Sequence, residues 1–122
     1  MFADVPVALQ RWNDAGIDVR IYSSGSILAQ QLIFSTTQYG DLTRYLKGYF
    51  DTTTGPKAEA ASYGTIATAF ALPASEILFI SDVTLELDAA TKAGLQVKLA
   101  IRAGNLAQPS NVYPTITSFS EI

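Results

Sequence analysis

A small set of polar residues in this sequence could do chemistry, and each stands beside an apolar run or a predicted helix: Ser23, Ser24, Lys57, Ser81 and Asp82. A carboxylate such as that of Asp82 suits a hard cation like Mg²⁺, which takes oxygen ligands and keeps several of its waters. Hydroxyls and free backbone N–H groups at the start of a helix form an anion site, especially for phosphate. These residue types therefore predict a site for a phosphate group and a divalent cation.

Each of these residues also has a purely structural alternative. Asp82 stands just before a helix predicted from Thr84, and Asp is a favourable N-cap residue. The serines at 23–26 are also common helix caps. Lys57 is predicted in the first turn of a helix, where a cation opposes the helix dipole. That position indicates a nearby anion, but an exposed lysine also tolerates it at small cost.

The elements that must position these residues follow from hydrophobic periodicity. The run Ile77–Ile80 is continuously apolar, which is typical of a strand buried on both faces, and helical spacing begins beyond Asp82. Apolar and polar residues alternate at 17–22, which predicts a second strand. We expect helices at 4–15, 27–34, 56–71 and 84–92, strands at 17–22, 77–81, 95–101 and 115–119, and an irregular stretch at 35–55 with a short extended piece at 48–51.

Strands that alternate with helices predict an α/β fold, Rossmann-like, with a mostly parallel sheet flanked by helices and right-handed crossovers. The length of 122 residues suits one domain, 1–122. The carboxyl ends of parallel strands meet at one edge of the sheet, where α/β proteins bind their ligands. We therefore expect Ser23, Ser24, Lys57 and Asp82 to converge in one crevice.

Composition excludes several classes of function. The formal net charge is −3 and the eight basic residues are scattered, so we expect no nucleic-acid partner. The chain has no Cys and no His, which excludes thiolate and Ser-His-Asp catalysis and is compatible with the cytosol. No apolar run approaches the roughly 20 residues that span a bilayer, so we expect no membrane association.

A longer series of segments carries a family resemblance: Tyr22–Ser26, Ala29–Gln31, Gly40–Leu42, Gly48–Thr52, Gly55–Lys57, Ser62–Tyr63, Ile77–Val83, Glu86–Ala90, Arg102–Asn105 and Thr117–Phe119. In this order they resemble the haloacid dehalogenase superfamily of phosphotransferases, and within it the enolase-phosphatases of methionine salvage. The serine and aspartate motifs alone are weakly specific, but the full series in order is strongly specific and covers nearly the whole chain.

The resemblance implies a role for each candidate residue. Ser23 and Ser24 would bind the substrate phosphate, and Lys57 would neutralise its charge and steady the nucleophile. Asp82 would be a Mg²⁺ ligand, and Glu86 would orient the metal waters from a second layer. The implied substrate is the small-molecule phosphate 2,3-diketo-5-methylthiopentyl-1-phosphate, which is enolised and then dephosphorylated in the cytoplasm.

The sequence departs from the family pattern in one respect. The family's first motif is a strand that ends in an aspartate nucleophile, with an acidic residue two positions later. These 122 residues do not contain it, because Asp4 opens a helix and follows no strand. The resemblance thus predicts a core without its first strand and cap, inactive alone, and completed by an N-terminal segment. The alternatives are a phosphate- or Mg²⁺-binding module without catalysis, and a receiver-like domain, which would need an acidic pair after its first strand.

Overall fold

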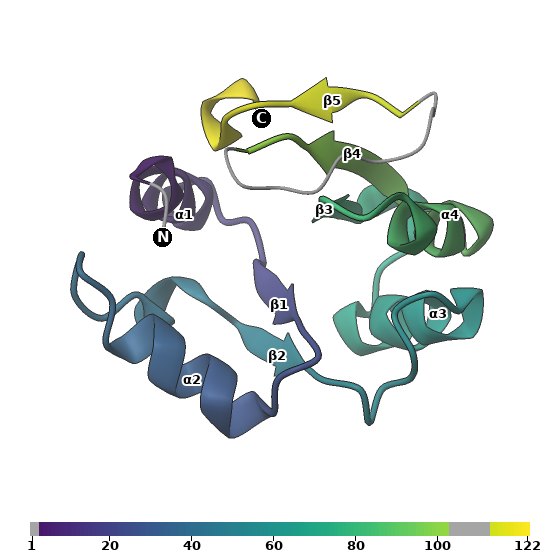
Figure 1. Cartoon of the computed structure of the whole chain (residues 1–122), viewed down its shortest axis with the longest axis horizontal. Helices are drawn as coiled ribbons and strands as arrows, with labels where there is room; N and C mark the ends of the chain where they lie inside the picture. The colour runs from purple at the N-terminus through teal and green to yellow at the C-terminus, as the bar shows by residue number, and fades with distance from the viewer. Residues whose placement is uncertain (1–2, 103–112) are drawn as a thin grey trace. The chain divides into compact units, whose positions relative to one another are not determined.

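The computed structural model describes residues 3–102 and 113–122, so most of the segment Arg102–Asn105, which belongs to the family resemblance, lies outside the described residues. These residues form two compact units, which we describe separately (Figure 1). The N-terminal unit ends at Thr53 and also includes Ile122, and the C-terminal unit runs from Thr54 to Glu121. Of the helices in the described residues, none has the length and apolar character needed to cross a membrane.

The N-terminal unit contains two helices, a 3₁₀ turn and a pair of parallel strands. Strands β1 and β2 pair with Ile21 opposite Tyr49. The buried core consists of Leu9, Leu42, Tyr45 and Leu46, and Trp12 packs against it. Trp12 is thus a packing residue of the first helix. The elements are α1 (Asp4–Asp14), β1 (Arg20–Tyr22), α2 (Ile27–Ser35), η1 (Thr43–Tyr45) and β2 (Gly48–Phe50).

The C-terminal unit is a three-stranded parallel sheet with two helices. The strand order is β3-β4-β5, and Phe79 of β3 lies opposite Val97 of β4. Tyr63 and Leu87, from the two helices, are fully buried in its core. The elements are α3 (Ala60–Phe70), η2 (Ala74–Glu76), β3 (Leu78–Ser81), α4 (Thr84–Lys92), β4 (Gln96–Ala100), β5 (Thr115–Ile116) and η3 (Phe119–Glu121).

The predicted α/β class with parallel strands is confirmed, and three details are wrong. The helix predicted from 56 begins at Ala60. The last strand is only Thr115–Ile116, because the chain turns into η3 at Phe119. The strand at 77–81 is not buried on both faces, since Leu78 is 38% exposed. Among the described residues β3 pairs only with β4 and is an edge strand, which explains its partial exposure.

Candidate functional site

The turn between β3 and α4 is organised by Ser81. Its hydroxyl accepts a hydrogen bond from the Val83 backbone N–H at 3.1 Å and donates to Glu86 Oε1 at 3.0 Å. Helix α4 has Val83 at its N-cap, without a side-chain cap. Asp82 is therefore not the capping residue, contrary to the structural alternative, and it is exposed at the tip of the strand. An exposed carboxylate at this position remains available to a cation.

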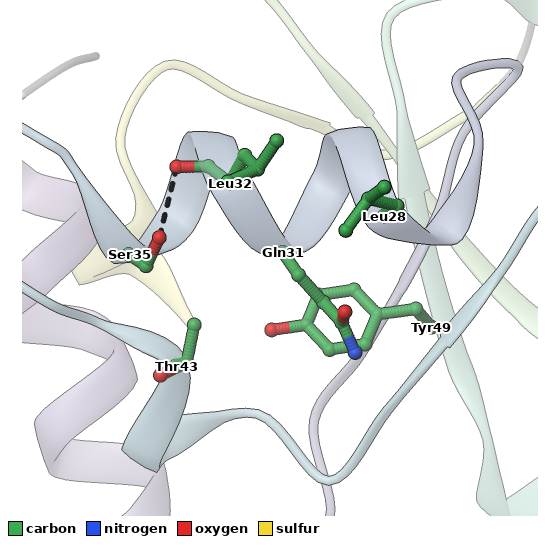
Figure 2. Close-up of a pocket in the computed structure, with 6 residues that line it drawn as sticks. All are labelled: Leu28, Gln31, Leu32, Ser35, Thr43 and Tyr49. Atoms are coloured by element: carbon green, nitrogen blue, oxygen red, sulfur yellow. Dashed lines mark hydrogen bonds between the residues drawn. The ribbon is translucent and has the colours of Figure 1, made fainter.

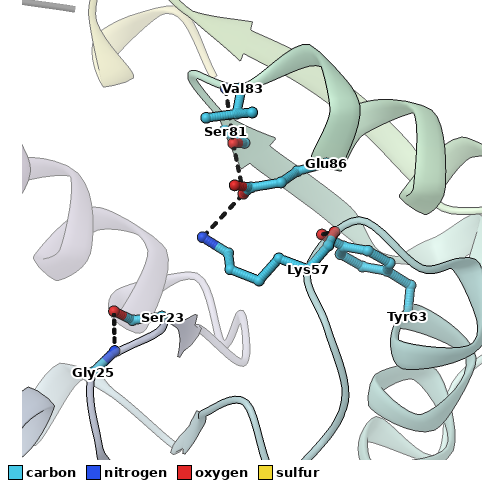
Figure 3. A network of polar contacts seen from close by, with 7 residues as sticks. All are labelled: Ser23, Gly25, Lys57, Tyr63, Ser81, Val83 and Glu86. Carbon is cyan, nitrogen blue, oxygen red and sulfur yellow. Dashed lines mark hydrogen bonds and ion pairs between the residues drawn. The ribbon is translucent and has the colours of Figure 1, made fainter.

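Lys57 and Glu86 form an ion pair in the C-terminal unit (Figure 3). The Lys57 Nζ atom lies 2.9 Å from Glu86 Oε1, and the two side chains are 28% and 14% exposed. The same Oε1 atom accepts the hydrogen bond from Ser81. Glu86 therefore links the lysine to the tip of β3. The resemblance implies that Glu86 orients metal waters, which stays a prediction, and the structure shows that its carboxylate pairs with Lys57.

Lys57 lies in a turn before α3 and not in the first turn of the helix as predicted. The physical reason is a pair of hydroxyls at the start of α3 that bind the carbonyls of this turn. The Ser62 hydroxyl donates to Pro56 O at 2.7 Å, and the Tyr63 hydroxyl donates to Lys57 O at 2.6 Å. Hydrogen bonds from α3 thus hold the turn, but Lys57 itself lies outside the helix. The argument that its charge opposes the helix dipole therefore does not apply.

The turn after β1 in the N-terminal unit carries Ser23 and Ser24. The Ser23 hydroxyl accepts a hydrogen bond from the Gly25 N–H at 3.2 Å, and Ser24 is exposed. Ser26 caps α2 by accepting from the Ala29 N–H at 3.1 Å. The capping alternative therefore holds for Ser26, whereas Ser23 shapes the turn and leaves the Ser24 side chain exposed.

Gln30 of α2 has a structural role at this turn that the sequence alone did not indicate. Its side chain is 3% exposed, and its Nε2 donates to Gly25 O at 2.9 Å and to Phe50 O at 2.8 Å. The first bond holds the serine turn and the second holds the end of β2. A glutamine on a predicted helix gives no sign in the sequence that it will be buried, so only the fold reveals this role.

Asp51 follows β2, next to the end of β1. Its Oδ1 atom accepts hydrogen bonds from the Thr53 hydroxyl at 2.5 Å and from the Thr53 N–H at 2.9 Å. These bonds stabilise the charged form and hold the pKa of Asp51 below its ordinary value. Asp51 therefore contributes a persistent negative charge at the strand ends of the N-terminal unit.

A hollow of about 350 Å³ lies elsewhere in the N-terminal unit (Figure 2). Tyr49 is at its wall, and burial raises the pKa of the Tyr49 phenol. None of the predicted site residues lines this hollow, so it is separate from the serine turn. Its lining residues are Leu28, Gln31, Leu32, Ser35, Thr43 and Tyr49.

The described residues fit a Mg²⁺ ion only in part. They contain no cluster of three or more acidic, His or Cys side chains that could hold a metal ion. Asp82 offers one exposed carboxylate, which is compatible with the way Mg²⁺ binds through one or two carboxylates, waters and substrate phosphate. The donor set therefore suits Mg²⁺ in kind, with the remaining ligands supplied from elsewhere.

The structure brings together Lys57, Glu86 and Ser81 in the C-terminal unit. Ser81 is the residue before Asp82 in the sequence. Ser23 and Ser24 belong to the N-terminal unit. Convergence of the serines with the lysine and the aspartate stays a prediction.

Comparison with known proteins shows similarity along the whole chain. No protein-family model matches it. It is 50% identical over 122 residues to "Enolase-phosphatase E1" of Synechococcus elongatus, covering all of this chain and 51% of that protein. It is 50% identical over 123 residues to the protein of that name from Pseudomonas aeruginosa, covering 53% of it. The chain thus spans about half the length of these two curated relatives.

Solved structures agree with this result. The UTR4 protein of Saccharomyces cerevisiae matches with a TM-score of 0.89 and 38% identity, over 99% of this chain and 57% of that one. An L-2-haloacid dehalogenase matches with a TM-score of 0.79 and 20% identity, over 98% and 53%. The chain therefore has the α/β fold of the haloacid dehalogenase structures over part of their length. It is a homologue of enolase-phosphatase E1 over about half of that protein.

Proposed function

We propose that this chain is the part of an enolase-phosphatase that binds the phosphate and the metal ion, within one incomplete domain of residues 1–122. The observation that carries the proposal is the 50% identity to enolase-phosphatase E1 along all 122 residues. The proposed substrate is 2,3-diketo-5-methylthiopentyl-1-phosphate, and the proposed setting is methionine salvage in the cytoplasm.

The proposed roles follow the chemistry of phosphoryl transfer, which depends mainly on positioning and on neutralising the charge of the phosphate oxygens. Lys57 supplies a positive charge that its loop and Glu86 hold in place. Ser23 and Ser24 hold phosphate oxygens, and the exposure of Ser24 supports this role. Asp82 would hold Mg²⁺ and Glu86 would orient its waters. The bound ion would add positive charge against the phosphate.

We further propose that turnover requires a segment that these 122 residues do not contain. No residue here is a candidate nucleophile of the family type, since Asp4 opens helix α1. Strand β3 pairs only with β4 among the described residues, and its Leu78 is 38% exposed. An apolar strand from the completing segment would bury this edge and bring the nucleophile, because open strand edges are templates for pairing.

The test is release of inorganic phosphate from the diketo phosphate with Mg²⁺. We expect none from the chain alone, and we expect release when it is mixed with the remainder of the Synechococcus elongatus relative. Lys57→Met should abolish the restored release, and Lys92→Met, which changes an exposed lysine of the same unit, should not.

Two results would contradict the proposal. Release by the chain alone at an ordinary phosphatase rate would show that no completing segment is needed. Binding of phosphate and Mg²⁺ without turnover, even with the completing segment present, would favour a binding module.

A further inference from the structure

The turn that carries Lys57 is fastened by a fully buried tyrosine. Tyr63 lies in the first turns of α3, and its side chain is 0% exposed. Its hydroxyl donates to the backbone carbonyl of Lys57 at 2.6 Å. Its ring lies 4.9 Å from the ring of Phe79, centroid to centroid. One side chain therefore contacts both the lysine turn and the strand that ends at Ser81.

We propose that Tyr63 is a positioning residue for Lys57. The Lys57 side chain is long and flexible, and it has many rotamers that do not reach Glu86. The hydrogen bond from the Tyr63 hydroxyl to the Lys57 backbone carbonyl fixes the position of the Lys57 backbone, from which the lysine side chain extends. Because the Tyr63 ring also packs on Phe79 of β3, that point is set relative to the strand whose last residue, Ser81, binds Glu86. Figure 3 shows Tyr63 beside Lys57, and Glu86 between Lys57 and Ser81.

The neighbouring residue reinforces the same turn. Ser62 is 2% exposed, and its hydroxyl donates to Pro56 O at 2.7 Å. Two consecutive carbonyls, those of Pro56 and Lys57, are thus bound by two consecutive hydroxyls of α3. The Pro56 carbonyl also accepts from the Glu59 N–H at 3.2 Å, so several hydrogen bonds hold this turn against the start of α3.

The ring and the hydroxyl of Tyr63 have separable tasks. The ring fills the core of the C-terminal unit, which is a stabilising role that phenylalanine can take over. The hydroxyl donates the hydrogen bond to Lys57 O. Tyr63→Phe therefore removes the positioning contact and keeps most of the packing. The role of Lys57 toward phosphate rests on the proposed function. The positioning of its amine by Tyr63 does not, because it can be measured without turnover.

The experiment is acetylation of the 122-residue chain by an N-hydroxysuccinimide ester, with the rate at each lysine followed by mass spectrometry. The Lys57 amine should react slowly, because its Nζ is held 2.9 Å from Glu86 Oε1 and its side chain is only 28% exposed, which limits the approach of the ester. The exposed Lys92 is the internal reference. We expect Tyr63→Phe to raise the rate at Lys57 relative to Lys92 by about three- to tenfold, the range of one net hydrogen bond.

Tyr45→Phe is the matched control. Tyr45 is also buried, and its hydroxyl accepts a hydrogen bond from Arg44 at 2.8 Å in the N-terminal unit. We expect the ratio of the rates at Lys57 and Lys92 to stay at the wild-type value. In a Glu86→Gln background, Tyr63→Phe should change that ratio less than in the wild type, because the pairing that it supports is already lost.

An unchanged ratio in a folded Tyr63→Phe variant would overturn the proposal. An equal effect in the Glu86→Gln background would also overturn it, because the hydroxyl would then act independently of the ion pair. If Tyr63→Phe does not fold, Ser62→Ala decides the matter, since it releases the adjacent carbonyl and should raise the same ratio. Phosphate release plays no part in these measurements, so the proposed function can fail while this inference stands.

Discussion

Gly55 precedes the lysine turn at a position that only glycine suits. Its φ is +140°, which side chains of L-residues rarely adopt. A Cβ atom added there would lie 2.3 Å from the Ser62 hydroxyl oxygen and 3.2 Å from Ser62 Cβ. Gly55→Ala would therefore strain the backbone and displace the hydroxyl that binds Pro56 O.

The magnitude follows from these two effects. Backbone strain of this kind costs about 1–3 kcal/mol, and loss of the hydrogen bond about 1 kcal/mol more. We expect Gly55→Ala to lower the free energy of unfolding by about 2–4 kcal/mol. With a urea m-value of about 2 kcal/mol/M, the midpoint should fall by about 1–2 M. Urea unfolding followed by circular dichroism measures this change.

Gly64 provides the control, because it lies inside α3 and an added Cβ would meet nothing within 4 Å. Gly64→Ala should stabilise the helix by up to about 1 kcal/mol. In a Ser62→Ala background, Gly55→Ala should cost about 1 kcal/mol less, because the displaced hydroxyl is gone. Equal midpoints for Gly55→Ala and Gly64→Ala would refute the argument from φ and close approach.

Two further predictions concern the N-terminal turn and the C-terminal end. Gln30→Met should lower the free energy of unfolding by about 1–2 kcal/mol because the carbonyls of Gly25 and Phe50 each lose a hydrogen bond from its Nε2, whereas exposed Gln31→Met should change little in the same urea titration. Glu121 accepts hydrogen bonds from the Thr117 and Ser118 N–H groups, which hold its pKa below the ordinary value of 4.5. Its stabilisation is therefore present above pH 4.5 and is lost as the pH falls through the folded-state pKa. Glu121→Gln should lower the melting temperature at pH 7 and lose this effect at low pH; an equal difference at pH 7 and pH 3 would contradict the assignment.

Local sequence patterns were sufficient to predict the strand–turn–helix segments that contain the candidate residues. The apolar run before Ser81 and the alternation before Ser23 each predicted a strand, and both strands are present. The same patterns predicted parallel pairing, which the registers confirm. These predictions succeeded because burial of apolar side chains follows the period of the element itself.

Boundaries and burial depended on partners that local patterns do not reveal. The helix expected from Pro56 begins at Ala60, because the hydroxyls of Ser62 and Tyr63 bind carbonyls in the turn before it. The apolar strand β3 was expected to be buried on both faces, but it lies at the edge of its sheet in the described residues. A hydrophobic run indicates that a strand can be buried, and the neighbours decide whether it is.

The sequence by itself determined the residue types of the site, the fold class and the family resemblance. The chemistry of a carboxylate, a lysine and hydroxyls belongs to the residues, and the apolar periods belong to the chain order. Tertiary structure decided which of them meet. The ion pair of Lys57 with Glu86 and the bond from Ser81 to the same oxygen join residues from different elements. No local propensity encodes such contacts, because they arise only when α3, β3 and α4 pack together.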